Sequence, residues 1–102
     1  MNTKTPFEIL TTARKLIATP EKWTKIFRAV DSDGRLCDPS ESQAVRFCAV
    51  GALHKVDPEG YEGAYNALLI ESGTSSVSKF NDTHTHAEVL ALFDAAIARS
   101  RP

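Results

Sequence analysis

A thiol and an imidazole share one stretch of the chain, AVRFCAVGALHK over residues 44–55, in which Cys48 precedes His54. Cysteine becomes nucleophilic where a helix N-terminus or a positive charge lowers its pKa and a base lies within reach. The pattern predicts a helix from Glu41 to about Lys55, so Cys48 falls about two turns from the N-terminal end. His54 follows six residues later, roughly 600° around the helix, and faces away from Cys48. We therefore predict that Cys48 is buried and not catalytic.

Small residues in the same stretch give a packing explanation for its composition. Four of them lie on neighbouring turns of the predicted helix: Ala44, Cys48, Gly51 and Ala52. Glycine inside a helix costs about 1 kcal/mol relative to alanine, and close approach of another segment is the usual compensation. We expect another helix to approach this face, because no large side chain holds it away.

The stretch NDTHTH, residues 81–86, carries side chains of the kinds that bind metal ions. His84 and His86 are two residues apart, so they point the same way only in an extended segment. Asp82 and Cys37 are further ligand types. The alternative is a capping region, in which these polar residues form a turn and begin the last helix. We favour the capping region, and we predict no metal site and no cofactor.

Composition restricts the class of protein. The chain has 102 residues, of which 42% are hydrophobic and 25% are charged, as expected for one globular domain over residues 1–102. Twelve basic and 13 acidic residues give a net charge of -1. There is no run of lysine or arginine, so nucleic acid is not indicated as a partner. Two cysteines are too few for a disulfide scaffold.

The N-terminal residues lack the basic start and apolar run of a signal peptide. No window approaches the ~18 consecutive apolar residues of a membrane span. We therefore expect a cytoplasmic protein that does not contact a membrane.

Three capping boxes predict helix starts, each pairing a Ser or Thr with a Glu or Gln three residues later. The pairs are Thr5 with Glu8, Ser40 with Gln43, and Thr85 with Glu88. They predict helices over residues 5–18 and 41–55, and a last helix that frays near residue 99. A further helix is predicted after Asp57-Pro58, with a left-handed stop at Gly73.

Two segments lack helical periodicity. Residues 25–37 carry short apolar runs on either side of the turn sequence DSDG, which predicts a short β-hairpin. Residues 74–82 are polar and irregular, which predicts a loop. The predicted fold class is therefore mainly α, with a single domain of about four helices and a short β-hairpin.

Aromatic side chains outside the patterned helices are candidates for a recognition surface. Trp23 and Phe80 are of this kind, and the polar residues Asn81, Asp82 and His84 follow Phe80 closely. We predict that these five residues contact a ligand. The alternative is that the two aromatic side chains close the ends of the core. No catalytic residue is assigned.

The segment RFCAVGAL, residues 46–53, followed downstream by Asn81-Asp82, has the pattern R-F/W-C-x-x-G-A-L with a later N-D. This pattern resembles a family of small bacterial and phage proteins carried as a domain of unknown function. The resemblance extends from about Phe7 to Ile97. It implies a stand-alone cytoplasmic domain with an accessory or interaction role, and no catalytic residue carries over from it.

The leading hypothesis for function is a non-enzymatic binding or interaction domain. Its partner is an unidentified protein or small molecule, and its surface comprises the Trp23 region and residues 74–86. The second hypothesis is a small metal-dependent or Cys/His hydrolase, whose candidate residues are Asp82, His84, His86 and Cys48. A homodimer formed through an unpartnered apolar helix face stays open as a third.

Overall fold

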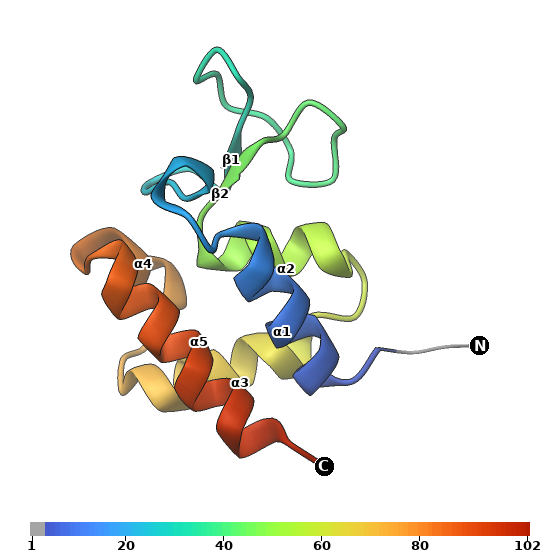
Figure 1. Cartoon of the computed structure of the whole chain (residues 1–102), viewed down its shortest axis with the longest axis vertical. Helices are drawn as coiled ribbons and strands as arrows, with labels where there is room; N and C mark the ends of the chain where they lie inside the picture. The colour runs from blue at the N-terminus through green and yellow to red at the C-terminus, as the bar shows by residue number, and fades with distance from the viewer. Residues whose placement is uncertain (1–3) are drawn as a thin grey trace.

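The computed structural model describes residues 4–102. Within them the chain forms five α-helices, one 3₁₀ turn and a pair of short strands (Figure 1). In chain order the elements are α1 (Pro6–Leu16), η1 (Pro20–Lys22), β1 (Ala29–Val30), β2 (Arg46–Phe47), α2 (Ala49–Val56), α3 (Glu62–Ser72), α4 (Val77–Thr83) and α5 (His86–Ser100). The mainly α fold class with a short antiparallel strand pair is thus confirmed.

Two of the three predicted capping boxes start helices. In the box that begins α1, Thr5 Oγ1 accepts from the Glu8 N–H at 3.2 Å and Glu8 Oε1 accepts from the Thr5 N–H at 2.9 Å. The Thr85–Glu88 box at the start of α5 has the same two bonds, at 3.1 and 2.8 Å. In both, the backbone N–H bonded to the carboxylate lowers the pKa of the glutamate. Both predictions are confirmed.

The hydrophobic core lies where α1 packs against α2, α3 and α5, with α4 closing one side of α2 and α3 (Figure 1). Each helix contributes at least one large, fully buried apolar side chain, and full burial of one such side chain stabilises the fold by about 1.5–3 kcal/mol. The principal ones are Ile9, Leu10, Leu53, Leu68, Val77, Val89 and Phe93. No helix within residues 4–102 has both the length and the apolar character that crossing a bilayer requires.

The predicted helix from Glu41 to Lys55 is wrong in its first half. The Asp38 carboxylate accepts from both the N–H and the hydroxyl of Ser40, so the Ser40 side chain does not cap a helix. The chain then turns, pairs with β1 as strand β2, and enters α2 only at Ala49. Local capping signals were therefore overridden by a turn at Asp38 and by strand pairing with a distant segment.

The predicted turn at Asp31–Gly34 is present, with the Gly34 N–H bonded to the Asp31 carbonyl at 2.9 Å. Gly34 has a φ of 80°, which glycine adopts without steric cost. The expected return strand makes only one bridge, between Val30 and Leu36. The ladder partner of β1 is instead β2, in an antiparallel register that pairs Ala29 with Phe47. The strand pair therefore joins segments further apart in sequence than predicted.

The helix predicted after Asp57-Pro58 begins later than expected. The Asp57 carboxylate accepts from the Gly60 N–H and so stabilises a turn, and α3 starts at Glu62. Its predicted end is confirmed, because Gly73 adopts the left-handed conformation with a φ of 66°.

Residues 74–82, predicted as a loop, instead include all but the last residue of the additional helix α4. Ser76 caps it by accepting from the Lys79 N–H at 3.2 Å, and Val77 is fully buried against the core. The helix spans only seven residues. So short a segment has little apolar periodicity for a sequence to display.

Gly51 packs against backbone, as its position in the stretch of small residues suggested, but the neighbour is not a helix. The carbonyl oxygen of Arg28 accepts from the Cys48 N–H at 3.1 Å and lies where a Cβ of residue 51 would be. The glycine therefore allows the segment before β1 to lie directly on the first turn of α2. This contact fixes the backbone of Arg28.

We predict that Gly51→Ala destabilises the protein by about 3 kcal/mol, because the new methyl group overlaps a backbone atom that cannot rotate away. Urea denaturation followed by circular dichroism measures the change. Gly63→Ala in α3 is the matched control, since the nearest atom there is a ring carbon of Pro6 at 3.0 Å. Equal stability of the two variants would contradict the prediction.

Candidate functional site

The amide of Asn81 is completely buried and joins three segments of the chain. Its Oδ1 accepts from the indole Nε1 of Trp23 at 2.7 Å and from the N–H of Ala49 at 3.0 Å. Its Nδ2 donates to the carbonyl of Thr24 and to Asp82 Oδ1, both at 3.1 Å. The full hydrogen-bonding capacity of the amide is therefore used inside the molecule. Because the N–H of Ala49 lies in the first turn of α2, this side chain of α4 acts as a cap for another helix.

Asp82 holds a strained turn next to this amide. Its Oδ1 accepts from the N–H of Ile26 at 2.8 Å, while the N–H of Phe27 bonds to the carbonyl of Lys25 at 2.8 Å. This is a γ-turn centred on Ile26, whose φ is 76°. A positive φ is an outlier for a β-branched residue, and such strain costs about 1–3 kcal/mol. The Ile26 side chain is 72% exposed, so burial in the core does not offset that cost.

The remaining predicted ligand contacts form a separate pair. The rings of Phe80 and His84 stack with centroids 3.7 Å apart, and His84 Nδ1 donates to the Phe80 carbonyl at 2.8 Å. Trp23, by contrast, is half-buried and joined to Asn81. The structure thus brings Trp23, Asn81 and Asp82 together and places Phe80 with His84. Their contact with a ligand stays a prediction, because the bonds observed for them are internal.

The two histidines among the candidate metal ligands bond to different backbone carbonyls. His86 Nε2 donates to the carbonyl of Ile17 at 2.6 Å, whereas His84 bonds to the carbonyl of Phe80. Within residues 4–102 no group of three or more His, Cys, Asp or Glu side chains is placed to hold a metal ion.

Cys48 lies at the N-cap of α2, so its predicted place about two turns into a helix is wrong. Its Sγ accepts from the Gly51 N–H at 3.3 Å. Desolvation raises the pKa of the Cys48 thiol, although the backbone N–H groups of Gly51 and Val50 act in the opposite direction. The side chain is 4% exposed, which confirms its predicted burial. Among residues 4–102, no histidine forms a hydrogen bond with this thiol.

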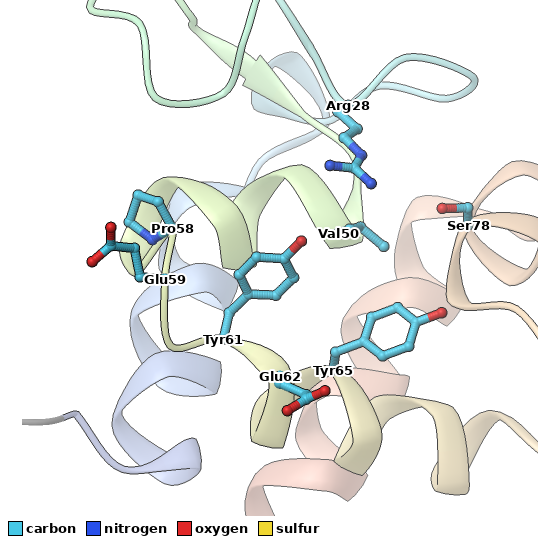
Figure 2. Close-up of a pocket in the computed structure, with 8 residues that line it drawn as sticks. All are labelled: Arg28, Val50, Pro58, Glu59, Tyr61, Glu62, Tyr65 and Ser78. Carbon is cyan, nitrogen blue, oxygen red and sulfur yellow. The ribbon is translucent and has the colours of Figure 1, made fainter.

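A cleft of about 530 Å³ opens between the segment before β1, the turn after α2, and helices α3 and α4 (Figure 2). We call it the Arg28 cleft. It is lined by Arg28, Val50, Pro58, Glu59, Tyr61, Glu62, Tyr65 and Ser78. Figure 2 shows the guanidinium of Arg28 and the hydroxyl of Tyr61 directed into the same space, with Glu62 on the far side of the tyrosine rings.

The guanidinium of Arg28 suits recognition of an anion, whereas Glu59 and Glu62 are the two carboxylates of the lining. The ion pairs found within residues 4–102 are Arg14 with Asp94 and Arg99 with Glu71. Neither involves Arg28, so no carboxylate in these residues lies within ion-pair distance of its guanidinium. A guanidinium presents several donors in a planar fork that matches a carboxylate or a phosphate.

The aromatic side of the cleft is formed by Tyr61 and Tyr65, and a stacking contact holds the first of these rings. The Tyr61 ring stacks on His54 with centroids 5.6 Å apart. Sequence reasoning missed Arg28 because it fell in the predicted hairpin, and it missed Tyr61 and Tyr65 because both fell in the helix predicted after Asp57-Pro58. Their i, i+4 spacing was the available signal, since it puts both rings on one helix face.

Fold and site together define a small α-helical domain in which a strained segment is held against two helices beside an arginine-containing cleft. The chain belongs to DUF6197, a family of unknown function, whose model matches residues 1–99. This confirms the resemblance to a domain of unknown function. No curated protein and no solved structure matches the chain.

We predict that Asn81→Ala destabilises the protein by about 3 kcal/mol, because Trp23 Nε1–H and the Ala49 N–H both lose their acceptor. Asn81→Asp keeps the acceptor but places a second carboxylate beside Asp82. Burial and that like charge raise the pKa of the introduced carboxyl in the folded state. The variant should therefore lie nearest the wild type below about pH 4 and lose stability as the pH rises.

Denaturation at a series of pH values measures both effects. Asn66→Ala on the exposed surface of α3 is the control, since Asn66 makes no side-chain hydrogen bond within residues 4–102. A loss at Asn81 no larger than the loss at Asn66 would show that the buried amide does not hold the segments together.

We predict that a small alkylating reagent modifies Cys37 in the folded protein, whereas Cys48 reacts only after unfolding. Cys37 is half-buried and Cys48 is buried. Desolvation raises the pKa of both thiols, with the Glu41 carboxylate adding at Cys37, so labelling should accelerate as the pH rises. Mass spectrometry of Cys37→Ser and Cys48→Ser resolves the two sites. Rapid labelling of folded Cys37→Ser would contradict this.

Proposed function

We propose that this protein is a non-enzymatic binding domain that captures a ligand carrying a carboxylate or phosphate in the Arg28 cleft. The observation that supports this most directly is an arginine with no ion-pair partner in residues 4–102, directed into a cleft with two phenol rings. The bidentate bond between guanidinium and an oxyanion is among the stronger polar contacts available to a protein.

The way in which Arg28 is held supports the proposal. Its carbonyl lies on the first turn of α2 over Gly51, and two residues earlier the Ile26 N–H is fixed by Asp82. The backbone from Ile26 to Arg28, which carries the guanidinium, is therefore held in place without a ligand. Preorganisation reduces the entropy cost of binding, and backbone strain of the kind at Ile26 is concentrated at functional sites.

The shape and charges of the cleft narrow the ligand class. The rings of Tyr61 and Tyr65 favour a flat apolar body, which a phenol can contact edge-on or face-on. Glu62 lies on the side of the rings away from Arg28, where it favours a hydrogen-bond donor on the ligand (Figure 2). The residues that line the cleft within the described chain include no cysteine, so the cleft offers no thiol nucleophile.

Binding of a minimal ligand tests the proposal. Benzoate has a carboxylate on a flat ring, and benzamide has the same shape without the charge. We expect benzoate at millimolar concentration to shift the NMR signals of the Arg28 Nε–H and of the Tyr61 and Tyr65 rings. Benzamide should bind on the order of tenfold more weakly, because a charge-assisted bond to a guanidinium is about twice as strong as a neutral one.

The matched variants are Arg28→Gln and Arg35→Gln, because Arg35 is an exposed arginine that does not line the cleft. Arg28→Gln should abolish the preference for benzoate while Arg35→Gln retains it. Equal binding of the two ligands by the wild type, or shifts confined to other surfaces, would refute the proposal.

A further inference from the structure

A second hollow, of about 340 Å³, lies among the C-terminal end of α1, η1, β2 and the last turn of α2. We call it the lysine groove, after the three lysines among its lining residues. The side chains that matter for its chemistry are Lys15, Leu16, Lys22, Val45, Phe47 and Lys55. It shares no lining residue with the Arg28 cleft, so it is a separate surface.

The charge of the lysine groove has one sign. Three of its lining residues are lysines, and no aspartate or glutamate in the described part of the chain lines it. The only hydrogen bond found there for a lysine ammonium runs from Lys55 to the backbone carbonyl of Glu41, at 3.5 Å. The whole chain carries a net charge of -1, so this positive groove departs from the average of the surface. A concave wall of one charge focuses the field on what enters it.

Helix dipoles account for part of this arrangement. Lys15 and Lys55 lie in the last turns of α1 and α2, where a positive side chain complements the partial negative charge of the helix end. That explanation requires one lysine at each helix end. It does not explain why Lys22, from the separate η1 turn, lines the same hollow, or why apolar side chains line it as well.

Part of the lining of the groove is apolar and partly accessible. Val45 is 40% exposed, Leu16 is half-buried, and Phe47 is buried with 4% exposure. A hollow lined by apolar side chains and three lysines suits an amphipathic occupant, in which carboxylates meet the lysines and one bulky apolar side chain contacts the apolar lining.

We propose that the lysine groove docks a short acidic segment of a partner protein that inserts one bulky apolar side chain. Single-stranded nucleic acid is the poorer fit, because bases stack on exposed aromatic rings and the ring of Phe47 is buried. A membrane surface is also poorer, because it requires an extended apolar face with basic residues around it, whereas this apolar area is a small hollow.

Fluorescence anisotropy on the full chain tests the proposal with a labelled synthetic peptide of glutamates around one phenylalanine. The comparison probes are the same peptide with serine in place of phenylalanine, an oligothymidylate and phosphatidylserine vesicles. We expect the phenylalanine peptide to bind most tightly, and its dissociation constant to rise with salt.

The decisive variants reverse two charges at a time. The double variant Lys22→Glu with Lys55→Glu should weaken binding on the order of tenfold or more, because two attractive pairs become repulsive. The double variant Lys4→Glu with Lys79→Glu changes the net charge equally at lysines outside the groove, and it should retain the wild-type affinity. Circular dichroism confirms that both variants are folded.

Four results would overturn the inference: no binding of the phenylalanine peptide, equal binding of the serine peptide, equal losses in the two double variants, or tighter binding of the oligothymidylate or the vesicles. None of them bears on the Arg28 cleft, because Arg28 does not line the groove.

Discussion

In the buried amide of Asn81, one side chain completes the hydrogen bonding of three segments that are distant in sequence. Its oxygen serves the indole of Trp23 and the first N–H of α2, and its nitrogen serves the carbonyl of Thr24. Burying an amide is costly unless every donor and acceptor finds a partner, and these bonds are directional. Only one relative placement of α4, α2 and the segment before β1 meets all of these requirements, so the amide specifies that placement as well as stabilising it.

The consequences extend along the chain from Trp23. The segment leaves Asn81 at Thr24, makes its strained turn at Ile26 under the carboxylate of Asp82, and then lays the carbonyl of Arg28 over Gly51. The two sequence segments that carry the resemblance, residues 46–53 and Asn81-Asp82, therefore meet at one place. Within residues 4–102 the Cys48 N–H and Gly51 contact the carbonyl of Arg28, and the Asn81 amide bonds to the carbonyl of Thr24 in the same segment. Cys48 and Asp82 are residue types that suggest catalysis or metal binding in a sequence. In the structure their hydrogen bonds instead hold backbone segments in place.

What the sequence could predict follows the range of the interactions concerned. The boxes at Thr5 and Thr85 were recognised because each is complete within four residues. The box at Ser40 failed because the Asp38 carboxylate, two residues earlier, engages the same hydroxyl. The pairing of β1 with β2 and the hydrogen bond between Asn81 and Trp23 join residues far apart in sequence. No local sequence pattern predicts such contacts. The Arg28 cleft was hidden for another reason: Tyr61 and Tyr65 have the spacing of a buried stripe, and only the arrangement of α2 and α4 around them leaves the space open.

Helix α2 connects the two proposed surfaces. Val50, in its first turn, lines the Arg28 cleft, and Lys55, in its last turn, lines the lysine groove. A helix is stiff over eight residues, so the placement of its start also sets the position of its end. Asn81 helps to fix that start by accepting from the N–H of Ala49, together with the bond from the Cys48 N–H to the Arg28 carbonyl. The same buried amide therefore contributes to the geometry of both surfaces. A change that tilts α2 alters both together, whereas a change to a lysine at the groove rim or to Arg28 alters only the surface to which it belongs.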